Sequence, residues 1–518
     1  MTITMAKVPR LAPAALLALL LAPPAQADWK FVPTIALTET LTDNVGMQSS
    51  EYAHGAWVHQ VTPGLSVAHV GPRLKLAGSY QLNYFAYTGG KVAGTRDSQQ
   101  QYQAGAEAVV IDDLLFFDAA ASRGTQSASP FGPQVNNNLY ALGNTTDIST
   151  WRVSPYLRHR FGGRADLSAR YTRDSVDTGI GALGSSDADS VDVRLVSGEL
   201  FRTLGWGLSY NRQDIDGERA GQTTSEMAAA NLSWRLSRTL SLTASGGYDR
   251  YDYESKDGSP TEGNNWSAGF DWVPSSRTRV QLAGGRHFYG NTWNLAASHR
   301  SRRTVWSVNY NDGITNTRSQ FLQPATIQTA SMLDAMFRSS IPDPMERRQA
   351  IADYMASHGL TPGLANPTNF FSNRFIRQKG FQAAMVLDGP RADLTFSAFD
   401  MRRNALSKAP VVSDPLGMDL AALNDNVQQR GVSAILNYAI TPRSMAQGGL
   451  TLTRSRSLTT GIVDNQQALR AGLTRKLGNR LAGAFEVRHV RGSSEFGSGR
   501  RYHENAISAT ITMQFPAR

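Results

Sequence analysis

The sequence contains no cysteine and no long hydrophobic run. Zero cysteines in 518 residues exclude a disulfide framework, so the fold must depend on hydrogen bonds and packing. No segment has the roughly 18 consecutive apolar residues of a spanning helix, which excludes a helical membrane protein. Hydrolase patterns such as Gly-x-Ser-x-Gly and His-Glu-x-x-His are also missing, and His287 and His299 form a pair without a third ligand in view. We therefore expect no enzyme, no metal site and no cofactor.

Negative charge is in the minority. Lys and Arg number 52 against 42 Asp and Glu, a formal net charge of +10 (52 − 42), and without Lys7 and Arg10 the charge is +8 (10 − 2). A basic surface suits polyanionic partners. For an exported chain, these are the phosphates of lipopolysaccharide and acidic polysaccharides, and nucleic acid is not expected.

The first residues have the pattern of an export signal. Lys7 and Arg10 form a positive region, residues 11–21 an apolar core, and Ala25-Gln26-Ala27 a cleavage site. The alternative, a membrane anchor, is disfavoured because the apolar core is short and Pro23-Pro24 ends it. We therefore expect a cleaved signal peptide over residues 1–27.

The rest of the chain alternates between apolar and polar side chains, most clearly in residues 264–318. Within 264–273, Trp266, Ala268, Phe270 and Trp272 share one face of a strand, and small polar side chains share the other. The pattern begins near residue 30 and continues to the last strand. It fits either a soluble sheet with one buried face or a membrane barrel whose apolar face meets lipid.

Turn lengths distinguish these two possibilities. Short turns such as Gly71-Pro72, Gly162-Gly163 and Gly478-Asn479 alternate with long loops rich in Gly, Ser and Asn. This asymmetry is typical of the periplasmic turns and extracellular loops of outer-membrane barrels. Counting the strands gives about 22, an even number that places both chain ends on the short-turn rim. We predict an all-β fold, a transmembrane antiparallel outer-membrane β-barrel of about 22 strands over residues 28–518.

One segment, residues 320–367, departs from the strand period. Asp343 offers an N-cap, Pro344 the first helical position and Glu346 a capping box, and His358-Gly359 is a helix end. We predict a helical insertion in one long extracellular loop. It either folds inward as a constriction or stands outside as a cap.

Two sets of side chains have predicted positions. Trp206, Trp234 and Trp272 each lie near a short turn, where an aromatic girdle meets the membrane interface, although tryptophan also has a high strand propensity. With the apolar face outward, the basic side chains expected in the lumen are Arg152, Arg158, Arg279, Arg300, Arg303, Arg470 and Arg488. Guanidinium groups bind carboxylate and phosphate in bidentate geometry. The arginines form either a track for a polyanion or a balanced network with acids such as Asp393 and Glu486.

Several short segments resemble the PEP-CTERM system-associated outer-membrane protein family. They are TETLTDNV at 38–45, VTPGL at 61–65, VSPYL at 153–157, WVPS at 272–275, GRHF at 285–288 and the helix start at Asp343-Pro344. The resemblance covers nearly all of the mature chain. It implies an association with exosortase and exopolysaccharide loci, and it transfers no catalytic residue to this sequence.

Two functional hypotheses compete. The first is a porin-like barrel that lets an exopolysaccharide or its precursors cross the outer membrane, which the resemblance favours. The second is a non-conducting receptor or scaffold for surface or secretion partners. Expected partners are outer-membrane lipid and lipopolysaccharide, acidic exopolysaccharide, periplasmic export components and, because residues 504–515 resemble a C-terminal assembly signal, the barrel-assembly machinery.

Overall fold

The computed structural model describes residues 29–89, 94–134, 138–178, 184–218, 221–322, 374–408, 423–424, 426–494 and 501–516. Its strands are β1 (Trp29–Thr42), β2 (Ala56–Val70), β3 (Leu74–Tyr87), β4 (Ser98–Ile111), β5 (Leu115–Ser127), β6 (Thr145–Arg160), β7 (Ala165–Asp177), β8 (Ser185–Ser197), β9 (Leu204–Gly217), β10 (Gly221–Arg235), β11 (Leu240–Asp252), β12 (Glu262–Ser275), β13 (Thr278–His287), β14 (Gly290–Arg300), β15 (Thr304–Asn316), β16 (Phe375–Asp388), β17 (Ala392–Ala405), β18 (Asn426–Thr441), β19 (Ser444–Ser457), β20 (Val463–Lys476), β21 (Leu481–Ser494) and β22 (Arg501–Gln514). A short helix, α2 (Thr317–Leu322), follows β15. The predicted signal peptide and residues 323–373 of the predicted helical insertion lie outside the described residues.

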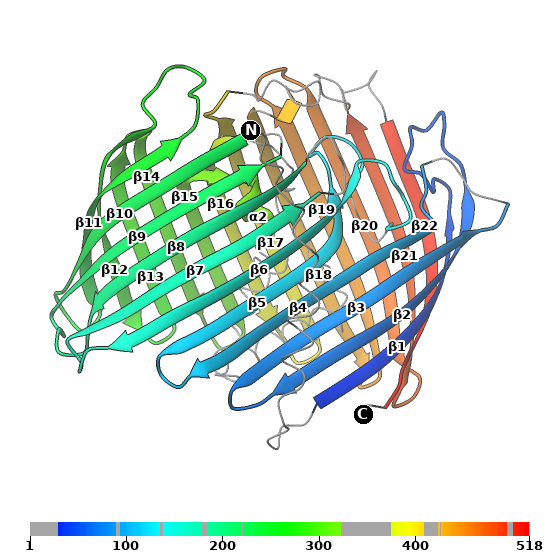
Figure 1. Cartoon of the computed structure of the whole chain (residues 1–518). Coiled ribbons are helices and arrows are strands. Elements are labelled where there is room, and N and C mark those ends of the chain that lie inside the picture. Colours follow the sequence, from blue (N-terminus) through cyan, green and yellow to red (C-terminus); the bar gives the residue numbers. More distant parts are fainter. Residues whose placement is uncertain are drawn as a thin grey trace, which may run out of the picture.

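The strands form one closed antiparallel sheet (Figure 1). Each strand pairs with the next along the chain, and β1 pairs with β22 from Thr34↔Gln514 to Thr42↔Ala506. Closure leaves no unpaired edge in the sheet, which is what a spanning sheet in lipid requires. The prediction of an antiparallel barrel of about 22 strands is confirmed.

The two rims differ in their connections. One carries tight turns, such as residues 71–73 and 442–443, and both β1 and β22 have their outer ends there, because Trp29 pairs with His69 and Gln514 with Thr34. The opposite rim carries the long loops, including residues 43–55 and 128–144. Two connections on this loop rim are nevertheless short, residues 218–220 and 288–289. We refer below to the turn rim and the loop rim.

Prolines within strands are placed where a ladder is interrupted. The β2–β3 ladder omits residues 62 and 63, and the β6–β7 ladder omits residues 154 and 155. Pro63 and Pro155 lie in these two gaps, because proline has no N–H to donate to a neighbouring strand. Their ladders on the other side, to β1 and β5, are continuous.

The outer face of the barrel is apolar and the inner face polar. On β1, Leu37 and Leu41 are 51% and 54% exposed, whereas Thr40 and Thr42 on the other face are 7% and 2% exposed. In the described part of the chain, no helix has the length and apolarity needed to cross a bilayer. The closed ring, the apolar outer face and the difference between the rims define a transmembrane β-barrel of the outer-membrane type.

Candidate functional site

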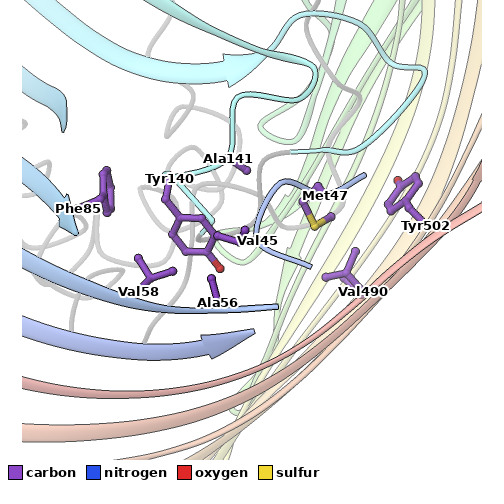
Figure 2. Packing of buried hydrophobic residues seen from close by; sticks show 10 residues of the cluster. Val45, Met47, Ala56, Val58, Phe85, Tyr140, Ala141, Val490 and Tyr502 are labelled. Atoms are coloured by element: carbon purple, nitrogen blue, oxygen red, sulfur yellow. The ribbon is translucent and has the colours of Figure 1, made fainter. Parts of the chain in front are cut away.

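Two loops fold onto the inner wall near the loop rim. Val45 and Met47 come from the loop after β1, and Tyr140 and Ala141 from the loop after β5. All four are buried in one hydrophobic cluster, the mouth cluster (Figure 2). Its wall residues are Ala56, Val58, Phe85, Ala468, Val490 and Tyr502. The wall of a lumen is expected to be polar, and this apolar patch of the wall is therefore the surface on which the two loops pack.

A buried ion pair lies beside the mouth cluster. Arg488 on β21 donates to both carboxylate oxygens of Glu504 on β22, with Nη2 to Oε1 at 2.9 Å and Nε to Oε2 at 3.1 Å. The Glu504 side chain is 0% exposed. The Tyr140 hydroxyl donates to Glu504 Oε1 at 3.0 Å and accepts from Arg488 Nη2 at 3.1 Å, and Thr42 Oγ1 also donates to Oε1 at 3.0 Å. The loop is therefore fixed to the wall by the hydrogen bonds of Tyr140 to this charged pair as well as by packing.

Alkaline pH should loosen this attachment. Burial, reinforced by the Glu504 carboxylate, raises the pKa of the Tyr140 hydroxyl well above its ordinary value of 10. A raised pKa in the folded state contributes stability that is complete below pH 10 and is lost as pH rises above it. In guanidinium titrations of the barrel in detergent between pH 8 and 11, the unfolding free energy should fall above pH 10.

The matched control for this titration is Tyr140→Phe, which removes the titrating hydroxyl. At pH 8 this variant should be about 1–2 kcal/mol less stable, because it loses hydrogen bonds to charged groups. Above pH 10 its curve should approach that of the native chain. Parallel curves over the whole range would contradict the assignment of the alkaline transition to Tyr140.

The loop that carries Tyr140 also reaches β20 and the start of β18. Ser129 Oγ donates to Asn424 Oδ1 at 3.1 Å, and the Gly132 amide donates to Asp464 Oδ2 on β20 at 2.9 Å. Phe131 is buried against Leu423 and Val427 at the start of β18. Because β5 and β18 are far apart around the ring, this loop crosses the lumen.

Helix α2 makes a second crossing. It follows β15, yet Arg318 bonds to β7 and β8, with Nη1 2.6 Å from Asp174 Oδ1 and Nε 2.9 Å from Ser186 Oγ. Phe321 packs on Ile148 and Val176 of the same wall. Arg318 is 4% exposed, so its charge depends on the Asp174 carboxylate for compensation. The described start of the predicted insertion thus lies inside the barrel.

Helix α2 is also hydrogen-bonded to the wall on its own side of the lumen. Gln320 Nε2 donates to Gln378 Oε1 on β16 at 2.8 Å, and its own Oε1 accepts from Arg403 Nη2 on β17 at 3.3 Å. Arg403 also donates to Gln429 Oε1 on β18 at 3.2 Å. The helix is therefore bonded to both sides of the lumen.

A third connection joins two loops at the loop rim. Ser255, between β11 and β12, forms an isolated antiparallel bridge with Ser407, which follows β17. The Lys256 amide donates to the Leu406 carbonyl at 2.9 Å, and Lys408 forms an ion pair with Glu254. This pairing ties loops from strands that do not adjoin in the sheet.

The arginines expected in the lumen are spread over three sectors of the wall. Arg152 and Arg158 are on β6, Arg279 and Arg300 on β13 and β14, and Arg470 and Arg488 on β20 and β21. Arg303 lies instead in the exposed turn between β14 and β15, not on a strand. The next strand, β15, begins at Thr304, one residue later than the alternation indicates, and the Ser301 hydroxyl caps the turn by accepting the amides of Arg303 and Thr304.

Most of these side chains have local partners. Arg279 forms a bidentate pair with Asp271 at 3.0 and 2.6 Å, and Arg158 lies over the rings of Phe116 and Tyr156 at 5.6 and 5.2 Å. Arg470 is the register partner of Arg488. The structure brings Arg470 and Arg488 together but does not join the seven arginines into one continuous row.

The tryptophans predicted for a girdle lie on the outer face beside the turn rim. Trp234 and Trp272 are exposed to the membrane, and Trp206 contacts Phe201 edge-on with ring centroids 6.1 Å apart. Near the loop rim, exposed tryptophans on the outer face include Trp57, Trp266 and Trp293. Indole rings therefore occur toward both membrane interfaces, where such amphipathic rings are favoured.

The residues that fix the crossings were not identified from the sequence. Tyr140 lies in a polar loop, and Arg318 lies where the alternating pattern ends. Glu504 and Asp174 could have been noted as carboxylates on the lumen face of strands, but alternation assigns a face and not a partner.

The two histidines considered as a pair lie far apart in the hairpin. His287 Nδ1 is 2.6 Å from Asp249 Oδ2, whereas His299 Nδ1 is 2.8 Å from Thr278 Oγ1 at the other end of β13. Over the described ranges, no group of three metal-ligating side chains is present.

No protein-family model matches this chain, and no curated protein matches it. Among solved structures, the siderophore receptor PirA from Pseudomonas aeruginosa is similar with 11% identity and a TM-score of 0.43, over 96% of this chain and 81% of that chain. The FrpB iron transporter from Neisseria meningitidis (F5-1 variant) is similar with 11% identity and a TM-score of 0.49, over 94% of this chain and 83% of that chain. The siderophore receptor PirA from Acinetobacter baumannii is similar with 9% identity and a TM-score of 0.44, over 94% of this chain and 80% of that chain. These similarities transfer no ligand and no residue role to this chain.

Proposed function

We propose that this chain is an outer-membrane barrel of the receptor or scaffold type, whose lumen is obstructed by its own loops. The observation that carries the proposal is the pair of crossings, by the loop after β5 and by α2. The loop packs through Phe131 against Leu423 and Val427 at the start of β18, and α2 bonds through Arg318 to Asp174 on β7. A barrel of 22 strands is wide enough to conduct freely if empty, so segments fixed across it point away from an open pore.

The attachments are suited to a stable obstruction. Arg318 of α2 is buried with its partner Asp174 on β7, and the loop after β5 is held by the Tyr140 hydroxyl, which bonds to both members of the buried Arg488–Glu504 pair of the wall. Separating Arg318 from Asp174 leaves an uncompensated charge away from water, which costs about 3–5 kcal/mol. Segments that merely rested on the mouth of the barrel would need no such attachments.

Conductance in planar bilayers tests this proposal. The native chain should give far smaller steps than the ~40–45 Å backbone diameter of an empty barrel of this size would allow, taking ~4.8 Å strand spacing and ~40° tilt. Heat-modifiable migration in the same preparation serves as the control for a folded barrel. Large, stable open steps from the native protein would contradict the proposal.

A conduit for an acidic exopolysaccharide is the second candidate. It is supported by the family resemblance and by a group on the inner wall near the turn rim, where Phe116 and Tyr156 stack with centroids 5.1 Å apart and Arg170 lies 3.9 Å from the Tyr156 ring centroid. Aromatic rings with guanidinium groups suit anionic sugars. Native channels that conduct and are blocked by an acidic glycan would favour this conduit over the receptor.

The proposed location and assembly follow from the same barrel. We propose export through the signal peptide at 1–27 and insertion by the barrel-assembly machinery, with β22 as the final strand to close on β1. Periplasmic export components would meet the turn rim, and surface partners the loop rim.

A further inference from the structure

The outer wall carries an apolar groove where β12, β13 and β14 adjoin. Its volume is about 360 Å³, and its lining includes Trp266, Ala268, Phe270, Leu282, Gly284 and Trp293. The groove exists because two small residues lie between two indole rings. A Cβ at Gly284 would lie 2.6 Å from Cζ3 of Trp293, so the ring can cover this position only while it is glycine.

The groove faces the membrane near the loop rim. Trp266 lies four residues from Glu262, where β12 begins at that rim, which is roughly 13 Å along the strand. Since the loop rim of such barrels is the extracellular one, the groove opens to the outer leaflet. Its volume is within the range of ligand sites, and its aromatic and aliphatic walls suit an acyl chain.

Positively charged side chains lie at the end of the groove that is nearer the loop rim. Arg286 is the register partner of both Trp266 and Asn291, and Asn291 lines this end. Arg286 is exposed, and its guanidinium has no ion-pair partner in the described part of the chain. The neighbouring Arg250 is neutralised by Glu262, with Nε 3.6 Å from Oε2.

Two further cations lie beside Asn291. Arg377 Nη2 donates to the Asn291 carbonyl at 2.7 Å. Arg377 and Lys379 share the Asp312 carboxylate, at 2.9 and 3.5 Å. Together with Arg286 these residues bring three positive charges and one negative, an excess of two (3 − 1). An apolar groove that ends in excess positive charge is complementary to a lipid with a phosphate headgroup.

We propose that this groove binds one phosphorylated glycolipid of the outer leaflet, of the lipid A type. An acyl chain lies between Trp266 and Trp293, and a phosphate meets Arg286. A second copy of this chain would also cover apolar surface, and the test below distinguishes it from a lipid. The site is on the lipid-facing wall and is independent of the obstruction in the lumen.

Native mass spectrometry of the full chain in detergent, with added bisphosphorylated lipid A, tests the site. The native protein should retain one lipid A molecule in preference to phosphatidylethanolamine. Arg286→Gln should lower the bound fraction roughly tenfold, because a charged hydrogen bond is lost, and Ala268→Leu should fill the groove and abolish the adduct. The matched controls, Arg277→Gln and Trp272→Ala, change the same hairpin at the turn rim and should retain the adduct.

Three results would overturn the proposal. Equal losses in the controls would mean that lipid binds around the whole barrel, and equal retention of phosphate-free lipid A would exclude recognition of phosphate. A native dimer that Ala268→Leu dissociates would make the groove an interface between copies of this chain. Heat-modifiable migration shows which variants are folded. If only one of Arg286→Gln and Ala268→Leu folds, that variant is compared with the controls.

Discussion

Replacing Arg488 with alanine should lower the free energy of unfolding by about 3–5 kcal/mol. The substitution removes the only cation that is shown to hydrogen-bond to the fully buried Glu504 carboxylate in the described part of the chain, and the Tyr140 hydroxyl and Thr42 Oγ1 still donate to it. Neither compensates a full charge, so the barrel must hydrate or protonate Glu504. Guanidinium titration in detergent micelles measures the loss.

Two further variants test whether that loss of stability comes from the unpaired buried charge. Arg491→Ala changes an exposed arginine three positions along β21 from Arg488, on the opposite face of the strand, and should alter stability by no more than about 0.5 kcal/mol. The double substitution Arg488→Met with Glu504→Leu removes both charges and should recover most of the stability, because the apolar mouth cluster adjoins them. If Arg488→Ala were as mild as Arg491→Ala, the buried pair would not support Tyr140 as we describe.

Replacing Arg318 with alanine should open the lumen. The substitution removes the bonds from α2 to Asp174 and Ser186 and leaves the Asp174 carboxylate buried without its partner. A loss of about 3 kcal/mol from the closed arrangement corresponds to a shift of roughly 10² in the ratio of open to closed states. In planar bilayers, the open probability should rise by that order, with larger conductance steps.

The control for this measurement is Arg303→Ala, which removes an arginine from the exposed turn between β14 and β15 and should leave conductance unchanged. Asp174→Asn should behave like Arg318→Ala, because it breaks the same pair from the other side. An unchanged open probability in both Arg318→Ala and Asp174→Asn would mean that α2 does not obstruct the pore.

The barrel itself could be predicted from the sequence because its determinants are local. Alternation with period two assigns each residue of a strand such as 264–273 to one face, and the tight turns at Gly71-Pro72 and Gly162-Gly163 fix the connections. Successive antiparallel strands joined in this way can only be neighbours, so counting them gives the ring. The same reasoning placed Trp234 and Trp272 at the membrane and Arg279 in the lumen.

Local patterns fail at strand ends, as Arg303 illustrates. A residue next to a turn can continue the alternation in the sequence and still lie in the turn, because the end of a strand depends on how the turn is closed. Here the Ser301 hydroxyl accepts the amides of Arg303 and Thr304, and only the Arg303 carbonyl pairs with β16, by accepting the Asp388 amide.

The sequence by itself determined the strands, their faces and the two rims, whereas only the tertiary structure decided that the lumen is crossed. Arg318 and Asp174 are separated by 144 positions in the chain, and Tyr140 and Glu504 by 364. Such partners meet only after the sheet has closed and its diameter has set which inner walls a loop can reach. A period of two contains no information on distance across a ring, and the irregular loops that make the contacts have no period at all.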